Sequence, residues 1–329
     1  MTIARCFRSA VAALAVAGVM LAAGLAQAQE KVHVALGEPP SVESLAFLIA
    51  LERAKERGIE FEITSFAKEE LAIQSIVNGQ ANIGVGGPYP VIQRTKVPLK
   101  VVFQMSRLVF FPVVSKEYAT WQDLDGEPFT FHGRGSGTEA IGNILAKRNG
   151  IEFGERSYVP GSENRIIAMI NGQIKATIVD LASKNLLLEK GGDDFHVLPS
   201  IDNPASDELI FASTEWMENN QEQVDIIVEE LLRVWREMAD NPNIIEEERA
   251  ARNLLSDQPQ EVIDEVVPFY VEAIKEGVFH PSGGGAEAAM ADFEFYTEAG
   301  QLEGSASDIK VEDFWDLGPL ERAREKLGG

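Results

Sequence analysis

The chain has 329 residues, 45% of them hydrophobic, with one cysteine and a formal net charge of −23. This length can bury the cores of two lobes of about 100 to 150 residues each. The acidic surface disfavours nucleic acid and anionic membranes as partners. Because Cys6 is the only cysteine, the rest of the chain has no disulfides, thiolate metal ligands or cysteine nucleophile.

Residues 1–28 have the pattern of a secretory signal peptide. Arg5 and Arg8 give a positive start, residues 10–25 form an apolar run, and the segment Ala-Gln-Ala at 26–28 is a small-x-small cleavage site. The apolar run is short for a membrane span of about 20 residues. The sequence therefore predicts export to the periplasm, cleavage after Ala28 and a soluble mature protein.

The next residues alternate strand and helix patterns. KVHVAL at 31–36 predicts a strand, residues 43–57 a helix that ends at Gly58, and residues 60–65 a second strand. This order and spacing predict a right-handed parallel crossover unit. The loop after the first strand and Phe66 would then meet at one edge of a sheet. Phe66 is explained equally well as a core aromatic and as a ligand contact.

A unit of helix, stop, strand and loop occurs twice in the chain. In residues 68–90 the stop is Asn78-Gly79 and the strand 82–85 runs into Gly86-Gly87-Pro88. In residues 165–183 the stop is Asn171-Gly172 and the strand 176–179 runs into Asp180. The carboxyl ends of strands in open α/β sheets bind ligands, and the repetition predicts two lobes built alike. Asp180 would bind a ligand's amine or hydroxyl, or cap the helix that begins near Ser183.

Two segments are predicted to cross between the lobes. The apolar run 108–114 would enter the second lobe, and residues 207–213 would return as a strand to the first. Pro112 argues against a central position for the first segment in a sheet. Arg107 would face a bound anion or be an ordinary surface charge. The predicted organisation is a first lobe of residues 29–107 and 207–329 and a second lobe of residues 108–206.

A glycine-rich loop follows the predicted strand 128–132. GRGSGTE at 133–139 precedes a helix that ends at Asn149. Backbone N–H groups at such a helix start can hold a carboxylate, sulfonate or phosphate, and Ser136, Thr138 and Arg134 would add donors. The alternative is a capping box of Ser136 and Glu139, whose carboxylate would oppose an anion. We favour the anion cradle, since a cap needs one glycine and the loop has three.

The C-terminal third is predicted to be helical. Residues 221–240 carry an apolar stripe that would face a core, and further helices are predicted at 246–255, 259–276 and 287–299. Residues 283–285 are glycines and predict a loop, and the tail is predicted to pack as a terminal strap.

Several short motifs, in their order and spacing, resemble the NMT1/THI5-like periplasmic binding proteins of nitrate, sulfonate and taurine importers. They are NGQANIGVGG, PLKVVFQ, WQDLDGEPFTF, GSGTEAIGNILAKRNGI, INGQIKATIVD, EAGQLEG and LGPLERAREKLG. The resemblance implies a two-lobed α/β fold of the type II binding protein class, hinge-linked, with a ligand enclosed between the lobes. GSGTE is also similar to TAXI-type receptors of tripartite TRAP transporters, but GEPPSVES departs from their Gly- and Tyr-rich opening. A binding protein for a pyrimidine precursor is a further alternative, and the cysteine-rich motif of the family's enzyme relatives is absent.

Enzymatic chemistry has little support in the sequence. His33, His132, His196 and His280 lack metal-ligand spacing, and Ser136 lacks the glycines of a nucleophile elbow. No Walker loop or dinucleotide fingerprint is present. We therefore expect no enzyme activity, no cofactor and no metal site.

The predicted function is capture of a small organic anion, such as a sulfonate or carboxylate, and delivery to an ABC importer. The expected partners are the small-molecule ligand and the importer's membrane permease and ATPase, with the protein a monomer that binds no nucleic acid. By the resemblance, ligand contacts fall on the loops 38–41, 86–89 and 135–138 and near Asp180, and the residue patterns add Phe66, Arg107 and Arg134. The predicted contact residues are Glu38, Pro39, Pro40, Ser41, Phe66, Gly86, Gly87, Pro88, Tyr89, Arg107, Arg134, Gly135, Ser136, Gly137, Thr138 and Asp180.

Overall fold

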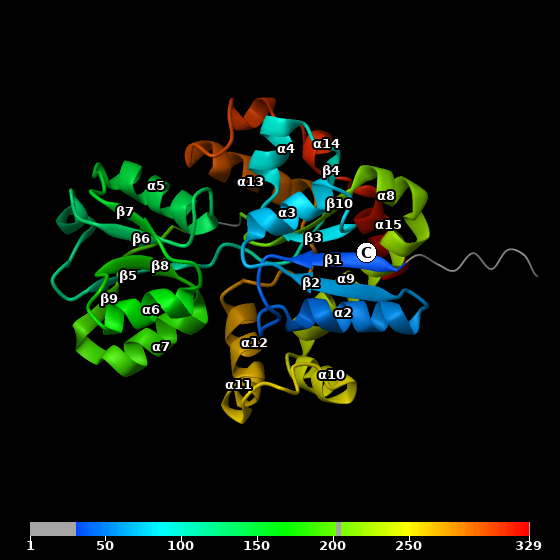
Figure 1. The fold of residues 1–329 in the computed structure, drawn as a ribbon, viewed down its shortest axis with the longest axis horizontal. Coiled ribbons are helices and arrows are strands. Elements are labelled where there is room, and N and C mark those ends of the chain that lie inside the picture. Colours follow the sequence, from blue (N-terminus) through cyan, green and yellow to red (C-terminus); the bar gives the residue numbers. More distant parts are fainter. Residues whose placement is uncertain (1–30, 202–204, 329) are drawn as a thin grey trace, which may run out of the picture.

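The computed structural model describes residues 31–201 and 205–328, so the predicted signal peptide lies outside the described residues. Two lobes, each built on a five-stranded mixed sheet, lie side by side (Figure 1). The larger lobe holds the first strands and the C-terminal helices, and the smaller lobe holds the middle of the chain. No helix in the described ranges is long and apolar enough to span a membrane.

The sheet of the larger lobe, here lobe 1, has the strand order β2-β1-β3-β10-β4. Its strands are β1 (Val32–Leu36), β2 (Phe61–Ser65), β3 (Ile83–Gly86), β4 (Leu99–Gln104) and β10 (Leu209–Ser213). β1 runs parallel to β2 and β3, whereas β10 is antiparallel to β3 and β4. Helices α2 (Leu45–Glu56), α3 (Glu69–Val77) and α4 (Tyr89–Thr95) connect the first four strands. The predicted parallel crossover at the start of the chain is present as β1-α2-β2.

The sheet of the smaller lobe, here lobe 2, has the order β7-β6-β8-β5-β9. Its strands are β5 (Phe111–Ser115), β6 (Phe129–Phe131), β7 (Arg156–Tyr158), β8 (Ala176–Val179) and β9 (Phe195–Val197). Its helices are α5 (Gly137–Asn149), α6 (Ser162–Ile170) and α7 (Leu181–Gly191), with short 3-10 turns η1 (Trp121–Leu124) and η2 (Gly192–Asp194). Its β6-α5-β7 and α6-β8 units give it the same kind of strand and helix alternation as lobe 1.

Pro112 does not keep β5 out of the sheet interior, so that sequence argument is wrong. β5 lies between β8 and β9. The Pro112 carbonyl accepts the N–H of Leu198, which lies just past the end of β9. A residue in a strand directs its N–H and C=O to the same neighbour. The missing proline N–H therefore faces the last position of a short edge strand, where it costs little.

The duplicated unit has the same backbone hydrogen bonds in both copies. After α3, the N–H of Gly79 donates to Ile76 and that of Gln80 to Ser75; after α6, Gly172 donates to Met169 and Gln173 to Ala168. Gly79 and Gly172 have φ angles of +70° and +69°, in the left-handed region that glycine adopts without steric cost. The Asn-Gly-Gln triplets are thus equivalent helix ends.

The C-terminal segment is helical, as predicted, with different bounds. Its elements are α8 (Thr214–Asn219), α9 (Gln221–Asp240), α10 (Ile244–Arg252), α11 (Gln260–Asp264), α12 (Val266–Lys275), α13 (Ala286–Glu298), η3 (Ala306–Asp308), α14 (Val311–Phe314) and α15 (Gly318–Lys326). The helix predicted to reach residue 255 ends at Arg252, because Asn253 and Leu255 have positive φ. The helix predicted over 259–276 is broken at Glu265 into α11 and α12.

Two large apolar clusters hold these elements together. One packs α2 and α9 against the strands of lobe 1, with Phe47, Phe103 and Trp235 fully buried. The other runs from Tyr89 in lobe 1 to Phe131 in lobe 2 without interruption. The two lobes therefore share a packed core along part of their contact.

Candidate ligand-binding cleft between the lobes

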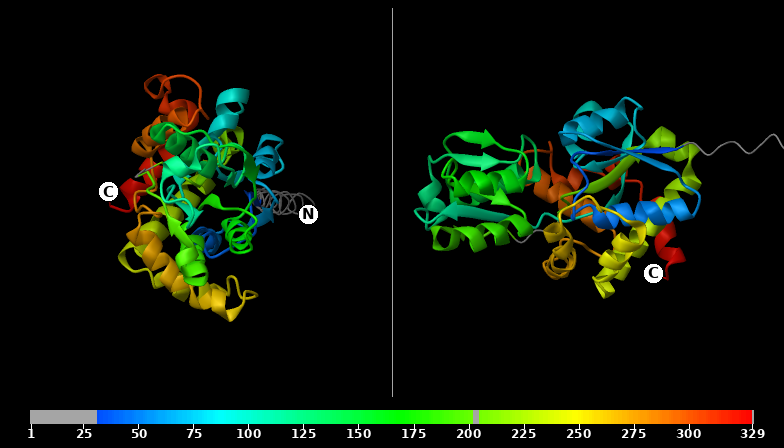
Figure 2. Two further views of the ribbon diagram at one scale, coloured as in Figure 1. Left: turned by 90° about the vertical axis from the view of Figure 1, so that its left-hand side faces the viewer. Right: turned by 60° about the horizontal axis from the view of Figure 1, so that its bottom comes forward.

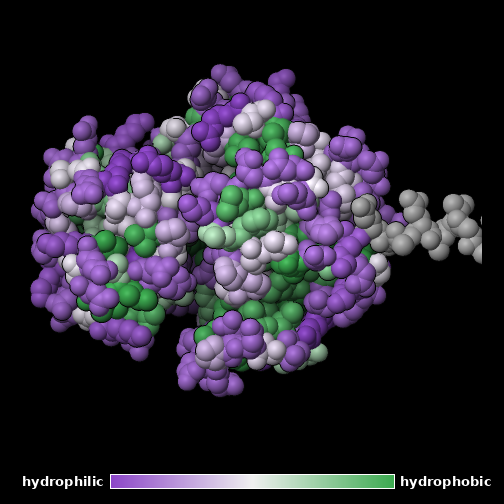
Figure 3. Space-filling view, viewed as in Figure 1, coloured by the Kyte–Doolittle hydropathy of each residue, from purple (hydrophilic) through white to green (hydrophobic). Residues whose placement is uncertain are grey.

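The strand ends of the two sheets face each other across a cleft. In lobe 1 the carboxyl ends of β1 and β3 and the start of β10 lie at one edge, since Leu209 pairs with Gly86. In lobe 2 the loops after β6 and β8 lie opposite this edge. The charges of Glu163 and Asp180 in lobe 2 raise the pKa of Glu38, which follows β1 in lobe 1. Figure 3 shows the hollow between the lobes.

Acidic side chains from both lobes converge on this cleft. We call Glu38, Glu43, Glu69, Glu163, Asp180, Asp207 and Glu208 the cleft carboxylates. They come from the loop after β1, from the first turns of α3 and α6, from the loop after β8 and from the segment before β10. Sequence analysis selected only Glu38 and Asp180 from this set. No local pattern marks the rest, which lie far apart along the chain.

Their environment disfavours ionisation. Loss of hydration between the lobes raises the pKa of Glu38, and the charges of Glu163 and Asp180 raise it further. Glu38 and Glu43 remain open to solvent, but protein atoms surround them on most sides. For Asp207 and Glu208, which are half-buried, burial and then the charge of Glu69 raise the pKa well above its ordinary value.

Five of the cleft carboxylates have no hydrogen-bond or ion-pair partner among the described residues. They are the carboxylates of Glu38, Glu43, Glu163, Asp207 and Glu208. Asp207 is held by its backbone, because its N–H donates to the carbonyl of Ser106. Ionisation of groups without partners in a partly dehydrated place costs free energy.

The glycines after β3 make room for Glu69. Burial raises the pKa of Glu69, while a hydrogen bond from the Gly87 N–H to its carboxylate acts in the opposite direction. Gly86 has a φ of +147°, and a Cβ there would lie 2.6 Å from Glu69 Oε1. The Gly86-Gly87 turn thus brings backbone close to a carboxylate that sequence analysis had treated only as part of a helix. Pro88 follows as the residue before α4.

The glycine-rich loop before α5 uses its polar groups as a helix cap. The Gly135 N–H donates to Glu139 Oε2 at 2.7 Å, and Ser136 Oγ accepts the Glu139 N–H at 3.4 Å. Ser136 Oγ also donates to the Gly133 carbonyl at 2.8 Å, and Thr138 Oγ1 accepts the His132 N–H at 3.0 Å. Ser136 Oγ thus forms its half of the predicted capping box, whereas the Glu139 carboxylate accepts the N–H of Gly135 and not that of Ser136. Contact of 135–138 with a ligand stays a prediction.

Gly137 has a packing role of its own. A Cβ at this position would lie 2.4 Å from Leu108 Cδ2 and 3.5 Å from Asp207 Oδ1. The first turn of α5 therefore fits closely against both crossing segments. Asp207 lies beside a helix N-terminus, whose dipole favours a negative charge.

Two predicted cations do not bind a carboxylate directly. The guanidinium of Arg134 stacks on Tyr158, 4.8 Å from the ring centroid. Arg107 is half-buried in the crossing, its pKa is lowered by burial, and its Nε has no hydrogen-bond partner among the described residues. Neither arginine neutralises the cleft carboxylates by an ion pair in the described chain.

Tyr89 belongs to the core. It is fully buried, its hydroxyl donates to Asp292 Oδ2 at 2.5 Å, and it accepts the Trp315 indole N–H at 2.8 Å. Phe66 is half-buried and packs on the apolar cluster that joins the lobes. Both positions thus have structural explanations, and their contact with a ligand is not tested.

Among the remaining predicted contact residues, Ser41 and Asp180 form hydrogen bonds with residues three positions away in the chain. Ser41 donates its N–H to Ser44 Oγ at 2.9 Å, and Pro39 and Pro40 precede it at the start of this turn. Asp180 accepts the Ser183 N–H at 2.7 Å and the Ser183 hydroxyl at 3.1 Å. Asp180 therefore caps α7, which leaves its second predicted role, ligand contact, untested.

Arg165 is a positioning residue that the sequence did not reveal. It is fully buried and donates to the carbonyls of Val159 and Ile178 and to Ser162 Oγ, at 2.9 to 3.0 Å. Burial lowers its pKa to about 10, against the charges of Asp180 and Glu163. Arg165 thereby holds together the two lobe 2 segments that border the cleft.

The described residues contain no group of three or more His, Cys, Asp or Glu side chains placed to hold a metal ion. The cleft carboxylates are close enough to influence each other's charge, but they do not converge on one point.

Known structures share this architecture. A protein of Bordetella bronchiseptica RB50 is 19% identical, with 92% of this chain and 99% of that chain covered and a TM-score of 0.71. The putative periplasmic sulfonate-binding protein SsuA of Methylobacillus flagellatus KT is 17% identical (91% and 94% covered, TM-score 0.65). The periplasmic nitrate-binding protein NrtA of Synechocystis PCC 6803 is 13% identical (91% and 90% covered, TM-score 0.67). The predicted two-lobed fold of periplasmic binding proteins is thereby confirmed.

Comparison of sequences gives the family. No curated protein matches this chain. The family model described as NMT1/THI5 like matches residues 45–245, from α2 through α10, which is more than half of the chain. The chain therefore belongs to the NMT1/THI5-like family.

Proposed function

We propose that the protein is an extracytoplasmic solute-binding protein that encloses a small molecule between its lobes and delivers it to an ABC importer. The fold it shares with sulfonate-binding SsuA and nitrate-binding NrtA supports this. The proposal includes export by the signal peptide 1–28 and the lobe boundaries 29–107, 108–206 and 207–329. Its partners are the importer's permease and ATPase, and it acts without catalysis.

The charge of the cleft bears on the class of ligand. Sequence analysis favoured an organic anion, on the basis of the loop before α5. In the structure, the Glu139 carboxylate accepts the Gly135 N–H of that loop, and the cleft carboxylates come from segments on both sides of the space between the lobes. We therefore propose a ligand with at least one positively charged or proton-donating nitrogen, such as an amine or an aminopyrimidine.

The observation that carries this proposal is the set of five cleft carboxylates that have no hydrogen bond or ion pair among the described residues. A cation bound among Glu38, Glu43, Asp207 and Glu208 would relieve their mutual repulsion and gain charge-assisted hydrogen bonds. A sulfonate or nitrate in the same place would add to the repulsion. Differential affinity should consequently favour cations.

Thermal melting with a panel of compounds tests both parts of the proposal, the solute-binding function and the cationic class of ligand. A ligand that binds only the folded state raises the melting midpoint by mass action. The panel holds polyamines, amino acids and aminopyrimidines on one side and sulfonates, nitrate and carboxylates on the other. A shift with nitrogen cations that is lost in Asp207→Asn/Glu208→Gln would support the ligand class. A shift with anions alone would contradict the class and leave a solute-binding function standing.

Turnover is the outcome that would contradict the solute-binding function. If the purified protein chemically converts a panel compound, the binding-protein function is wrong. The control is Lys116→Met, which changes an exposed ion pair with Asp194 away from the cleft and should leave ligand shifts intact.

A further inference from the structure

His132 is a polar residue on the lobe 2 side of the cleft that the proposed function has not used. It follows β6 directly, at the strand end that faces lobe 1, and its ring is half-buried. In the right-hand view of Figure 2, lobe 2, in green, lies beside lobe 1. The charge of Glu70, in the first turn of α3 of lobe 1, acts on the pKa of His132. The ring therefore lies close to the lobe 1 side of the cleft.

A backbone hydrogen bond fixes which nitrogen of the His132 ring carries the proton. The N–H of Gly161, in the loop after β7, donates to His132 Nδ1 at 3.3 Å. A peptide N–H only donates, so Nδ1 is the unprotonated nitrogen and the neutral ring carries its hydrogen on Nε2. Burial and the charge of Arg165 lower the pKa of His132, which favours the neutral ring. Nε2–H is thus an uncharged donor, and no hydrogen bond of the described residues uses it.

Ser162 supplies a second unused donor next to this bond. It follows Gly161 directly and begins α6. Its Oγ accepts Arg165 Nη2 at 2.9 Å and the Asp180 N–H at 3.3 Å. Because a hydroxyl oxygen has two lone pairs, only the hydroxyl proton is left to form a further bond. That proton has no acceptor among the residues that the structure describes. Ser162 is only 7% exposed, so an unmade hydrogen bond there costs free energy.

Arg165 holds this loop in place without giving the lobe 2 wall an excess of positive charge. The fully buried guanidinium donates to the carbonyl of Val159 and to Ser162. The charges of Asp180 and Glu163 act on Arg165 with the opposite sign. One cation beside two carboxylates does not attract a further anion. The two donors of the wall therefore suit an uncharged acceptor better than a charged one.

The lobe 1 side of the cleft has the reverse character. The carboxylates of Glu38, Glu43, Asp207 and Glu208 have no hydrogen-bond or ion-pair partner among the described residues. Ionised carboxylates only accept hydrogen bonds. A ligand that satisfies both sides of the cleft must therefore carry a donor nitrogen at one end and an acceptor at the other.

We propose that His132 Nε2–H and the Ser162 hydroxyl bind an uncharged carbonyl oxygen of the ligand, which is therefore an amine that also carries an amide group. The inference rests on the proposed function, because it concerns the ligand of the same cleft. A carbonyl oxygen has two lone pairs and accepts both donors. A carboxylate would accept them as well, but it would meet the charges of Glu163 and Asp180. An alkyl group would leave both donors unpaired. Arg165 is a positioning residue that acts through Ser162.

Titration calorimetry and thermal melting with matched amines test this ligand class. The probes are ω-aminoalkanamides of several chain lengths, together with the ω-amino acid and the alkylamine of each length. All three carry the same ammonium group and differ only at the other end. We expect an amide of suitable length to bind at least about tenfold more tightly than the acid and the alkylamine of that length, and to raise the melting midpoint more.

Two substitutions at His132 separate the donor from the ring. His132→Phe keeps a ring of similar size without an N–H, whereas His132→Gln offers an amide N–H near the position of Nε2. The preference for the amide over the alkylamine should be lost in His132→Phe and largely kept in His132→Gln. Ser162→Ala also removes an acceptor of Arg165, so only its amide-to-alkylamine ratio is compared, and that ratio should fall several-fold. Lys116→Met, which changes an exposed ion pair with Asp194, should keep the wild-type preference.

Nitrogen-15 NMR of the imidazole rings tests the tautomer without any ligand. The signal that disappears in His132→Gln identifies His132. At neutral pH this ring should have a protonated Nε2 and an unprotonated Nδ1. A proton on Nδ1 would overturn the inference, because Gly161 could then not donate to this nitrogen.

The binding data distinguish failure of this inference from failure of the proposed function. Equal affinity for amides and alkylamines, or an amide preference that survives in His132→Phe, would overturn the inference and leave the cationic ligand class standing. No binding of any amine would contradict the cationic class and this inference together.

Discussion

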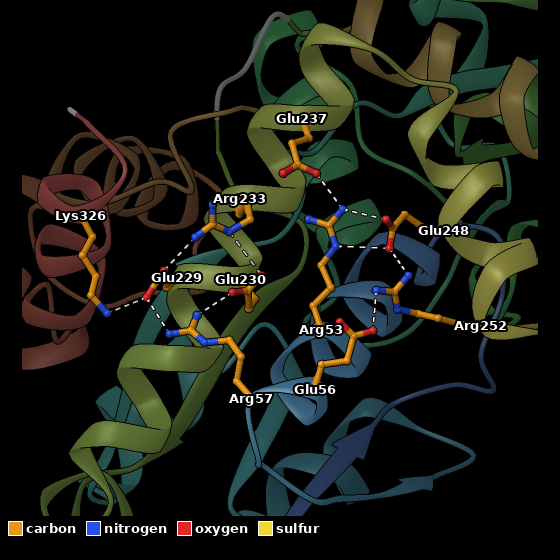
Figure 4. Close-up of polar contacts among 10 residues, drawn as sticks. All are labelled: Arg53, Glu56, Arg57, Glu229, Glu230, Arg233, Glu237, Glu248, Arg252 and Lys326. Atoms are coloured by element: carbon orange, nitrogen blue, oxygen red, sulfur yellow. Dashed lines mark hydrogen bonds and ion pairs between the residues drawn. The ribbon is translucent and has the colours of Figure 1, made fainter.

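Carboxylates have opposite surroundings in two regions of the protein, the helical side of lobe 1 and the cleft. On the helical side of lobe 1, acidic and basic side chains of α2, α9, α10 and α15 form two neighbouring ion-pair clusters, one around Arg53 and one around Arg57, together called the network here (Figure 4). Its members are Arg53, Glu56, Arg57, Glu229, Glu230, Arg233, Glu237, Glu248, Arg252 and Lys326. In the cleft, none of the seven cleft carboxylates has an ion pair among the described residues. The same side-chain type is paired with cations in one region and has no cationic partner in the other.

Glu229 shows what pairing achieves. Burial alone would raise its pKa, but hydrogen bonds from Lys326 and Arg57 outweigh this effect and lower the pKa. Asp207 experiences burial and further negative charge, and its pKa rises. The difference follows from pairing: Glu229 has cationic partners, whereas Asp207 has none among the described residues.

The largest expected effect comes from breaking the network. Arg57 bonds to Glu229 at 3.0 Å and to Glu230 at 2.5 Å, and these carboxylate side chains are 8% and 6% exposed. Arg57→Met should lower the free energy of unfolding by about 3 kcal/mol, because it leaves buried charges short of a partner. Urea unfolding measures this loss. Lys116→Met, which removes an exposed pair, should leave the unfolding midpoint unchanged, and equal losses would remove the distinction between regions.

Neutralising the cleft should have the opposite sign. Asp207→Asn/Glu208→Gln removes two carboxyl groups whose raised pKa makes ionisation costly in the folded state, so the melting temperature at neutral pH should rise by a few degrees. Affinity for a cationic ligand should fall at least about tenfold, as expected when charge-assisted hydrogen bonds are lost. Differential scanning calorimetry and titration calorimetry give the two values. Lower stability in this variant would mean that the two carboxylates are structural.

Asp292 adds a third kind of carboxylate, buried and hydrogen-bonded to neutral groups. Burial raises its pKa to about 7, against hydrogen bonds from Tyr89 and Ser206 and the charge of Arg107. Since this pKa exceeds the ordinary value of about 3.9, the folded state binds the proton more tightly than the unfolded state. Its contribution to stability is therefore full below about pH 4 and is lost as the pH rises to about 7.

Melting curves from about pH 5 to about pH 8 isolate this contribution by comparison with Asp292→Asn. In Asp292→Asn, an amide NH2 group replaces one carboxylate oxygen, so it cannot accept both the Tyr89 and the Ser206 hydroxyl as Asp292 Oδ2 does. The variant should therefore have a lower melting temperature than the wild type at about pH 5. Because asparagine does not titrate, the gap should narrow as the pH rises. A gap of constant size would show that Asp292 does not titrate in this range.

Salt should produce the smallest effect. Molar salt screens charges beyond about 3 Å, so repulsion among the cleft carboxylates should weaken and the wild-type melting temperature should rise slightly. The rise should be smaller in Asp207→Asn/Glu208→Gln. Equal rises in both proteins would indicate that the general surface charge, rather than the cleft, responds to salt.

Local signals in the sequence predicted local structure well. The Asn-Gly-Gln triplets predicted two helix ends, and their hydrogen bonds agree. The stripe over 221–240 predicted α9 with its bounds. The prediction from Pro112 was wrong, because the cost of a missing proline N–H depends on how long the neighbouring strand is. The sequence did not predict the break between α11 and α12 or the end of α10 at Arg252, because no proline or glycine lies at either place.

The site was less accessible to sequence reasoning. A glycine-rich helix start has the same sequence pattern whether it binds an anion or caps the helix, and the contacts of Glu139 with Gly135 and Ser136 became visible only in the structure. Glu43, Glu69, Asp207 and Glu208 are ordinary acidic residues in the sequence. Their shared surroundings appear only when the chain brings the starts of α2, α3 and β10 together.

The sequence by itself determined the alternation of strands and helices, the doubled unit, the helix ends and the family resemblance, because these depend on residues close together along the chain. Only the tertiary structure decided the charge of the cleft, the burial of Tyr89 and Arg165, and the hydrogen bond from Gly161 to His132. Those properties depend on distances between residues that are up to about two hundred positions apart, as Tyr89 and Asp292 are. Coulombic energy and hydration depend on such distances in space, and no pattern of neighbouring residues encodes them.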